Sequence, residues 1–201
     1  AFKNAYIFFM EKAFSAPNYA IKLKDRRDKV KNVMEKIDLF LTPSEYTRKV
    51  FIEFGIQEDR IKLSRNGLPC KVFPDLQKTK SEKIRFAFIG TIVPAKGVHL
   101  LIDAFNALKN ENAELKIYGR LYAYAGFEYY LPFLRRIAKN KNIKFMGEFR
   151  HENITDIFRE VDILVVPSIW HENAPLIIQE AFNTMTPVIA SNIGGILEII
   201  D

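Results

Sequence analysis

Apolar residues follow two alternating patterns along most of the chain. Short runs rich in Ile, Val and Phe, typical of buried parallel strands, occur at Lys83–Gly90, Leu115–Tyr118, Ile143–Met146, Ile163–Val166 and Pro187–Ala190. Between these runs apolar residues recur at helical spacing, first at Val98, Leu101, Ile102, Phe105 and Leu108. The alternation predicts an α/β fold, with a Rossmann-like parallel sheet flanked by helices.

The pattern before residue 83 is less regular. It predicts helices at Ala1–Phe14, Arg26–Glu35 and Glu45–Phe54, and short strands at Ile37–Thr42 and Ile61–Ser64. The stretch from Leu68 to Glu82 holds two prolines and several lysines and resembles a linker. We therefore expect a partial α/β domain over residues 1–68, a linker over 69–82 and a second domain over 83–201.

One sequence pattern occurs in both predicted domains. Asp38–Ser44 and Asp162–Ser168 each consist of an aspartate, an apolar strand and a Pro-Ser pair, and a helix follows each. Proline ends the strand, and serine can accept hydrogen bonds from the first amides of the helix. The repetition suggests two related α/β domains.

Charge and cysteine content narrow the possible partners and location. The formal net charge of +6 and a pI near 9.3 are compatible with phosphates, nucleic acid, acidic lipids or ordinary solubility. The single cysteine, Cys70, forms no internal disulfide and fits a reducing compartment. No apolar run reaches the roughly 18 residues of a membrane span. We expect a cytoplasmic location.

The first candidate binding site follows the strand that ends at Gly90. A short loop leads from Gly90 to Lys96, where the next helix is expected to begin. Ligands bind at the carboxyl ends of parallel strands, and helix N-termini attract phosphate. A bound anion would offset the unfavourable position of Lys96 near a helix N-terminus. An ordinary solvated lysine is the alternative.

The second candidate site surrounds a helix that starts near Pro175. Glu172 precedes this helix and Glu180 lies within it, eight residues further on. Helical rise over eight residues is about 12 Å, close to the reach from ribose to sugar in a nucleotide sugar. Free amides near Leu176 could hold a phosphate between the two carboxylates. A third site, Gly194-Gly195 before Glu198, allows close backbone approach or forms a plain turn.

Together these motifs resemble the donor half of the retaining GT-B glycosyltransferases of family four, the glycosyl transferases group 1. The resemblance is carried by Gly90 with Lys96-Gly97, by Glu172 and Glu180, by Pro187–Ser191, and by Gly194-Gly195 with Glu198. It covers about Lys83 to Asp201, and Asp38–Gly67 resembles the end of the family's N-terminal domain. The resemblance implies a hexosyltransferase that moves a sugar from a nucleotide sugar to an acceptor hydroxyl.

The resemblance also implies a role for each site residue. Lys96 in the loop after Gly90 would hold the donor diphosphate, and amides from Pro175, Leu176 and Ile177 would bind the distal phosphate. Glu180 would bind the ribose, and the turn at Gly147 would hold the base. Glu172 would contact the donor sugar near the reacting carbon, as the catalytic residue. Such enzymes usually need neither cofactor nor metal. The family commonly has an arginine where Thr91 stands, so either the donor binds more weakly or another residue, such as Arg120, supplies the charge.

The partners implied are a UDP- or GDP-linked sugar and a carbohydrate or lipid-linked acceptor, and no nucleic acid. The basic residues between Lys22 and Lys31 form either a solvated helix face or a peripheral contact with the inner face of the membrane. The alternative function is a non-catalytic nucleotide-sugar-binding module. Because the chain starts at Ala1 and stops just after Glu198, we expect it to be a piece of a longer enzyme and inactive alone.

Overall fold

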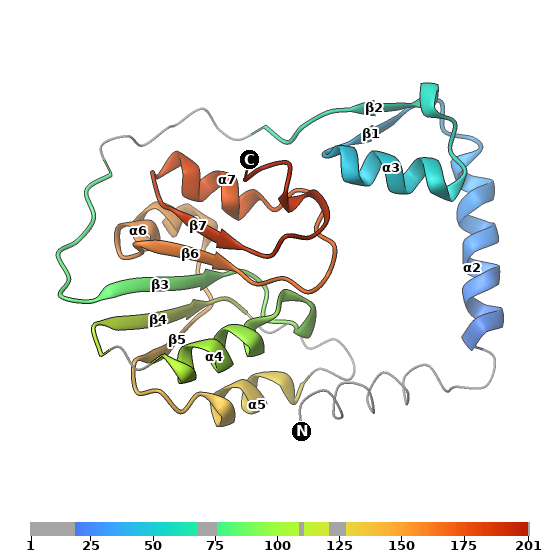
Figure 1. Cartoon of the computed structure of the whole chain (residues 1–201). Coiled ribbons are helices and arrows are strands. Elements are labelled where there is room, and N and C mark those ends of the chain that lie inside the picture. The colour runs from blue at the N-terminus through green and yellow to red at the C-terminus, as the bar shows by residue number, and fades with distance from the viewer. Residues whose placement is uncertain (1–18, 68–75, 109–110, 121–127, 201) are drawn as a thin grey trace.

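The computed structural model describes residues 19–67, 76–108, 111–120 and 128–200, with side chains from residue 24 (Figure 1). The helix expected at Ala1–Phe14 and the single cysteine, Cys70, lie outside these residues. The described residues form two units. The N-terminal unit comprises residues 19–67, and the sheet unit comprises residues 76–200.

Five parallel strands form the sheet of the second unit, in the order β5-β4-β3-β6-β7. The strands are β3 (Ile84–Ile89), β4 (Ala113–Tyr118), β5 (Ile143–Gly147), β6 (Ile163–Val166) and β7 (Val188–Ala190). All four ladders between neighbouring strands are parallel. The predicted α/β fold with a Rossmann-like sheet is confirmed, and each strand lies within a residue or two of its predicted bounds.

Helices cover both faces of this sheet (Figure 1). One face carries α4 (Val98–Ala107) and α5 (Tyr130–Ile137), and the other carries α6 (Ile154–Arg159) and α7 (Leu176–Asn183). Each face has its own apolar core, centred on Leu115 and Ile102 on one side and on Phe158 and Leu164 on the other. Because helices cover both faces of the sheet, most strand residues are apolar whichever face they point to.

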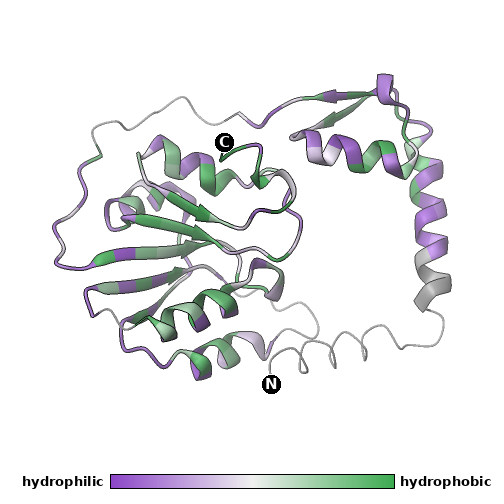
Figure 2. Cartoon of the chain, viewed as in Figure 1, coloured by the Kyte–Doolittle hydropathy of each residue, from purple (hydrophilic) through white to green (hydrophobic). Residues whose placement is uncertain are grey.

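Charged side chains interrupt the apolar pattern on the α6 face, which sequence reasoning did not anticipate (Figure 2). Arg85 is buried and forms an ion pair with Asp162, with 2.7 Å between Nη2 and Oδ1. Lys116 contacts both Glu114 and Glu160. Burial raises the pKa of Asp162, but hydrogen bonds and charge from Arg85 outweigh it and leave the pKa lowered. Pairing therefore makes these buried charges tolerable.

The N-terminal unit consists of α2 (Tyr19–Met34), β1 (Phe40–Thr42), α3 (Glu45–Phe54), the 3-10 turn η1 (Glu58–Arg60) and β2 (Ile61–Leu63). β1 and β2 pair in parallel, and α3 packs against both. Ser44 caps α3 by accepting a hydrogen bond from the Thr47 amide, and Gly55 ends the helix with φ of 110°. The predicted span of α3 is confirmed, whereas α2 begins earlier than expected.

Part of the predicted linker packs on the sheet unit. Lys78 donates hydrogen bonds to the carbonyls of Phe158 and Val161, at the end of α6, and to the Thr186 hydroxyl. The Phe158 carbonyl also accepts the Val161 amide at 3.3 Å, so Lys78 adds a further donor to it. Burial lowers the pKa of Lys78. The segment from Leu76 onward is thus held against the sheet unit.

Candidate active site

The loops at the carboxyl ends of β3, β6 and β7 form one connected structure. The Ala95 carbonyl, in the loop after β3, accepts hydrogen bonds from the amides of Ile169 and Trp170, in the loop after β6. Gly97 makes this approach possible, because a Cβ atom there would lie 1.9 Å from the Pro167 carbonyl oxygen. The structure therefore brings the first two candidate sites together at one edge of the sheet.

Lys96 and Glu172 meet directly at this edge. The Lys96 ammonium donates to the Glu172 carboxylate, with 2.7 Å between Nζ and Oε1. The Ser168 hydroxyl donates to the same oxygen, also at 2.7 Å. The side chain of Glu172 is 14% exposed and that of Lys96 is 33% exposed. The pair presents a cation and a carboxylate side by side at the rim of the sheet.

The local setting of Lys96 differs from the one expected. It ends the 3-10 turn η2 (Pro94–Lys96), and α4 begins only at Val98. Its ammonium is paired with the Glu172 carboxylate. The expectation that Lys96 binds an anion stays a prediction, and the Glu172 carboxylate is a second group that compensates its charge.

Glu180 lies on α7 and has a partner that sequence reasoning missed. His151 Nε2 lies 2.6 Å from Glu180 Oε1, and the Glu180 side chain is 14% exposed. His151 belongs to the 3-10 turn η3 (His151–Asn153) after β5, and no motif singled it out. Because α7 starts at Leu176, only part of the distance from Glu172 to Glu180 is helical, so the estimate of helical rise does not apply.

The start of α7 offers free backbone donors. Pro175 occupies the N-cap position and has no N–H, so Leu176 and Ile177 supply the amides of the first turn. A cavity of about 260 Å³ opens beside this start. It is lined from both units, by Pro43, Ser44, Arg65, Asn66, Ala174, Gln179, Gly195, Glu198 and Ile199. A second, apolar groove lies between α2 and α3, away from the predicted site residues.

The remaining predicted residues lie at neighbouring strand ends. Gly90 follows β3 and donates its amide to the Tyr118 carbonyl, and Gly147 ends β5 with φ of 81°. The Ile92 amide donates to the Arg120 carbonyl, which places Arg120 beside the loop that holds Thr91. The guanidinium of Arg120 contacts Glu148 at 3.3 Å. Its role as the replacement cation stays a prediction.

The third candidate site touches the second. The Gly195 amide donates to the Glu172 carbonyl at 2.7 Å. A Cβ atom at Gly195 would lie 1.7 Å from the Asn173 carbonyl oxygen. The expected helix start is a 3-10 turn, η4 (Gly194–Ile196). Two glycines are thus required because this turn is pressed against the backbone around Glu172.

The described residues also bear on other kinds of site. They contain no group of three or more His, Cys, Asp or Glu side chains arranged to hold a metal ion. None of their helices combines the length and apolar character needed to cross a bilayer. The expectation of metal-free chemistry stays a prediction.

The fold and these loops define an α/β protein with a ligand-binding edge at the carboxyl ends of its strands. Residues 73–201 match the family model described as glycosyl transferases group 1. Because that match covers more than half of the chain, the chain belongs to this family.

Curated relatives support the assignment. The chain is 25% identical over 190 residues to a putative glycosyltransferase, YtcC, of Bacillus subtilis, covering 85% of the chain and 47% of the relative. It is 28% identical over 203 residues to O-antigen chain mannosyltransferase B of Escherichia coli, covering 93% of the chain and 52% of the relative. The chain thus spans about half the length of the curated relatives it matches.

Solved structures share the GT-B glycosyltransferase fold at lower identity. The Anabaena protein HepE, solved with UDP and glucose, is 23% identical with a TM-score of 0.69, covering 82% of the chain and 47% of HepE. Sucrose-phosphate synthase of Thermosynechococcus elongatus is 21% identical with a TM-score of 0.71, covering 86% of the chain and 45% of the synthase.

Proposed function

We propose that the chain carries the donor site of a retaining hexosyltransferase, and that it is the donor half of a longer enzyme. The observation that carries the proposal is the Lys96–Glu172 pair, held at the edge where ligands of parallel sheets bind. Structures of HepE with UDP and with UDP-glucose support a nucleotide-sugar donor. UDP- and GDP-linked sugars are both candidates.

The geometry fits the charges that develop in sugar transfer. The bond between the sugar C1 and the diphosphate oxygen breaks while a bond to the acceptor oxygen forms, and the acceptor proton passes to the leaving diphosphate. Lys96 would neutralise the diphosphate, together with amides of Leu176 and Ile177. Glu172 would lie beside the sugar, where a carboxylate favours positive charge near C1. Glu180, oriented by His151, would accept hydrogen bonds from the ribose.

The non-catalytic nucleotide-sugar-binding module remains the second candidate. Donor binding is common to both, so only a transfer assay separates them. In the first candidate Glu172 contributes to turnover, whereas in the second the same residue only binds donor.

A binding experiment tests the donor site directly. Trp170 is the only tryptophan of the chain, is 68% exposed and lies two residues before Glu172, so its fluorescence should report ligand binding. Titration with UDP, GDP, ADP and their sugar conjugates identifies the base. We expect Lys96→Ala to weaken UDP or GDP binding by about 10- to 100-fold, since a charge-assisted contact contributes about 1.5–3 kcal/mol. Calorimetry gives the same constants independently.

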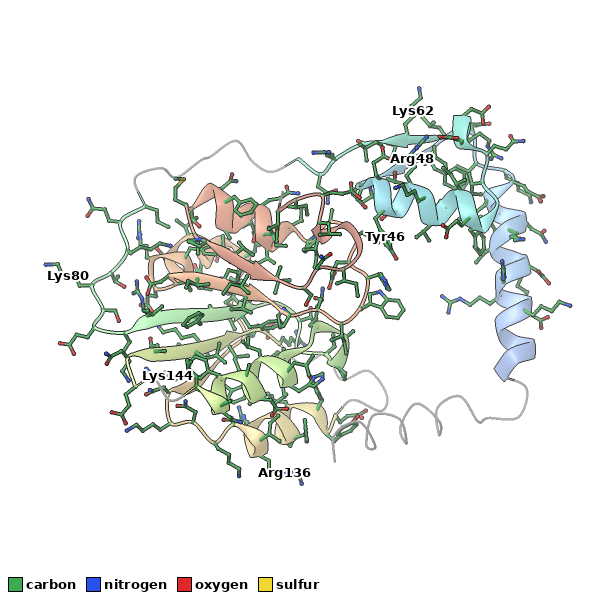
Figure 3. All side chains as sticks on the ribbon, viewed as in Figure 1. Tyr46, Arg48, Lys62, Lys80, Arg136 and Lys144 are labelled. Carbon is green, nitrogen blue, oxygen red and sulfur yellow. The ribbon has the colours of Figure 1, made fainter. Side chains whose placement is uncertain are left out.

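Two further variants complete this test. Glu180→Ala should also weaken binding of the nucleoside alone, because the ribose hydrogen bonds are lost. Lys80→Ala is the matched control, since Lys80 is exposed and lies far from the loops of the site (Figure 3). Unchanged affinity of both Lys96→Ala and Glu180→Ala would show that the donor binds elsewhere.

The acceptor, carbohydrate or lipid-linked, is proposed to approach from the N-terminal unit. A peripheral membrane contact through the basic helix α2 belongs to the same proposal. Two of its cations are engaged within the unit, because Arg27 and Lys31 lie 5.3 and 5.7 Å from the centre of the Phe54 ring. Lys24, Arg26 and Lys29 of α2 are exposed and available to anionic lipid headgroups.

A further inference from the structure

Glu198 joins the two units of the chain by an unusual contact. Its carboxylate accepts hydrogen bonds from the backbone amides of Glu45 and Tyr46, at 2.7 and 2.6 Å. These amides belong to the first turn of α3, whose N–H groups have no partner within the helix. Bonds from amides to a carboxylate are short and strong, and the helix dipole adds to them. The sheet unit therefore caps a helix of the N-terminal unit.

The residues on either side of Glu172 contact the same helix. The ring of His171 stacks on that of Tyr46, with centroids 5.5 Å apart and planes 5° from parallel. The Thr47 hydroxyl donates to Asn173 Oδ1 at 3.3 Å. Tyr46 lies at the end of α3 that faces these loops (Figure 3). His171 and Asn173 thus bind α3, while Glu172 between them binds Lys96.

The turn that carries Glu198 is fixed to the same three residues. The Gly195 amide donates to the Glu172 carbonyl at 2.7 Å, and a Cβ atom at Gly194 would lie 2.6 Å from that oxygen. A shift of the backbone before Glu198 therefore either breaks its hydrogen bond to the Glu172 carbonyl or moves Glu172 with it. The loop of residues 171–173, the turn before Glu198 and the start of α3 form one mechanical unit.

We infer that Glu198 is a positioning residue, which couples the start of α3 to the loop that holds Glu172. One consequence of the inference rests on the proposed function. A ligand that orders the loop of residues 171–173 will also order the start of α3. The N-terminal unit, and whatever acceptor it holds, is thereby aligned with the donor site.

Amide hydrogen exchange, followed by NMR on the 201-residue chain, tests the coupling. In Glu198→Gln one acceptor oxygen becomes a donor group, so we expect exchange at Glu45, Tyr46 and Gly195 to accelerate at least tenfold. Exchange at Leu115, whose amide bonds to Asn142 in the sheet unit, should stay unchanged. Glu58→Gln is the matched control, because it removes an exposed carboxylate of the N-terminal unit that contacts only Arg48 among the described residues.

The outcomes are distinct. If amide exchange accelerates at Glu45 and Tyr46 but not at Gly195, Glu198 is only a helix cap. If exchange accelerates at none of these three amides, Glu198 neither caps α3 nor couples it to the loop. Either result overturns the inference. If Glu198→Gln unfolds the chain, Tyr46→Ala tests the coupling from the other side and should accelerate exchange at Gly195.

Addition of UDP separates this inference from the proposed function. In the native chain UDP should slow exchange at Glu45 and Tyr46, and in Glu198→Gln this slowing should disappear although UDP still binds. Slowing that persists in the variant would overturn the coupling. Failure of UDP, GDP and ADP to bind the native chain would instead overturn the proposed function, and the exchange rates of the unliganded variants would still decide the role of Glu198.

Discussion

At the scale of single residues, the candidate site depends on contacts between residues that are distant in sequence. Lys96 and Glu172 were singled out separately, and only the fold shows that they form one ion pair. His151 could not be predicted, because it follows a different strand and carries no motif. A contact between residues distant in sequence depends on which loops the sheet brings together, and the strand order does not follow from local patterns.

Gly97 gives a prediction at this scale. It adopts φ of 68°, and an added Cβ would lie 1.9 Å from the Pro167 carbonyl oxygen. Gly97→Ala should therefore lower the free energy of unfolding by about 2–4 kcal/mol, through left-handed strain and a forced shift of the loop. Urea denaturation measures the change. Gly67→Ala, where nothing lies within 4 Å of the added Cβ, should stay within about 0.5 kcal/mol. Equal losses of stability in the two variants would contradict the close approach of Gly97 to the Pro167 carbonyl.

At the scale of elements, hydrophobic periodicity predicted the strands and α3 closely. It worked best where a strand is buried on both faces, as β6 is, because the apolar run and the strand then coincide. It failed to predict α6, which has only six residues, and the short 3-10 turns, since elements of this length carry less than two turns of periodicity. Hydrophobic periodicity also did not predict the buried charges of Arg85, Glu114 and Lys116, because ion pairing between strands is a tertiary property.

The contact between α4 and α5 predicts a dependence of stability on pH. His99 on α4 is buried, and its Nδ1 lies 2.8 Å from the hydroxyl of Tyr130 on α5. Burial lowers the pKa of His99, and the nearby charge of Asp103 opposes this only in part. The folded-state pKa is thus below the unfolded value of about 6.5. The contribution of neutral, buried His99 to the free energy of unfolding is present above pH ~6.5 and is lost as the pH falls through the folded-state pKa.

Thermal denaturation between pH 7.5 and 5 checks this expectation. The native chain should lose more stability over this interval than His99→Asn, whose amide can bond to Tyr130 but does not titrate. The difference grows by about 1.4 kcal/mol for each unit by which the pKa is lowered. Parallel pH profiles of the two proteins would show that His99 does not control acid stability.

At the scale of the whole molecule, the two units meet where the candidate site lies. Contacts from Glu198, Asn173 and His171 place the start of α3 beside the loop that holds Glu172. Figure 1 shows the two units side by side. The resemblance to the family gave the order of the motifs, but the sequence alone did not show that Glu198 bridges the units. That bridge depends on the relative placement of the two units, which no single motif encodes.

The arrangement predicts that the chain binds donor but does not transfer sugar. A GT-B enzyme works between two walls, and in the proposed function Lys96, Glu172 and Glu180 belong to the donor wall. Donor contacts are local to the sheet unit and should persist. Holding two substrates in register contributes roughly 7–11 kcal/mol to lowering the barrier. The chain spans only about half the length of its curated relatives, so we expect this contribution to be largely lost.

A transfer assay with labelled donor and candidate acceptors decides the matter. We expect the 201-residue chain to bind UDP or GDP in the fluorescence titration and to show turnover at least a thousandfold below that of the longer enzyme. Glu172→Gln in the longer enzyme should abolish transfer and leave nucleoside diphosphate binding within about threefold, since the diphosphate contacts come from Lys96 and the α7 amides. Comparable turnover from the short chain would mean that the acceptor binds within these residues, and the argument that two walls are needed would be wrong.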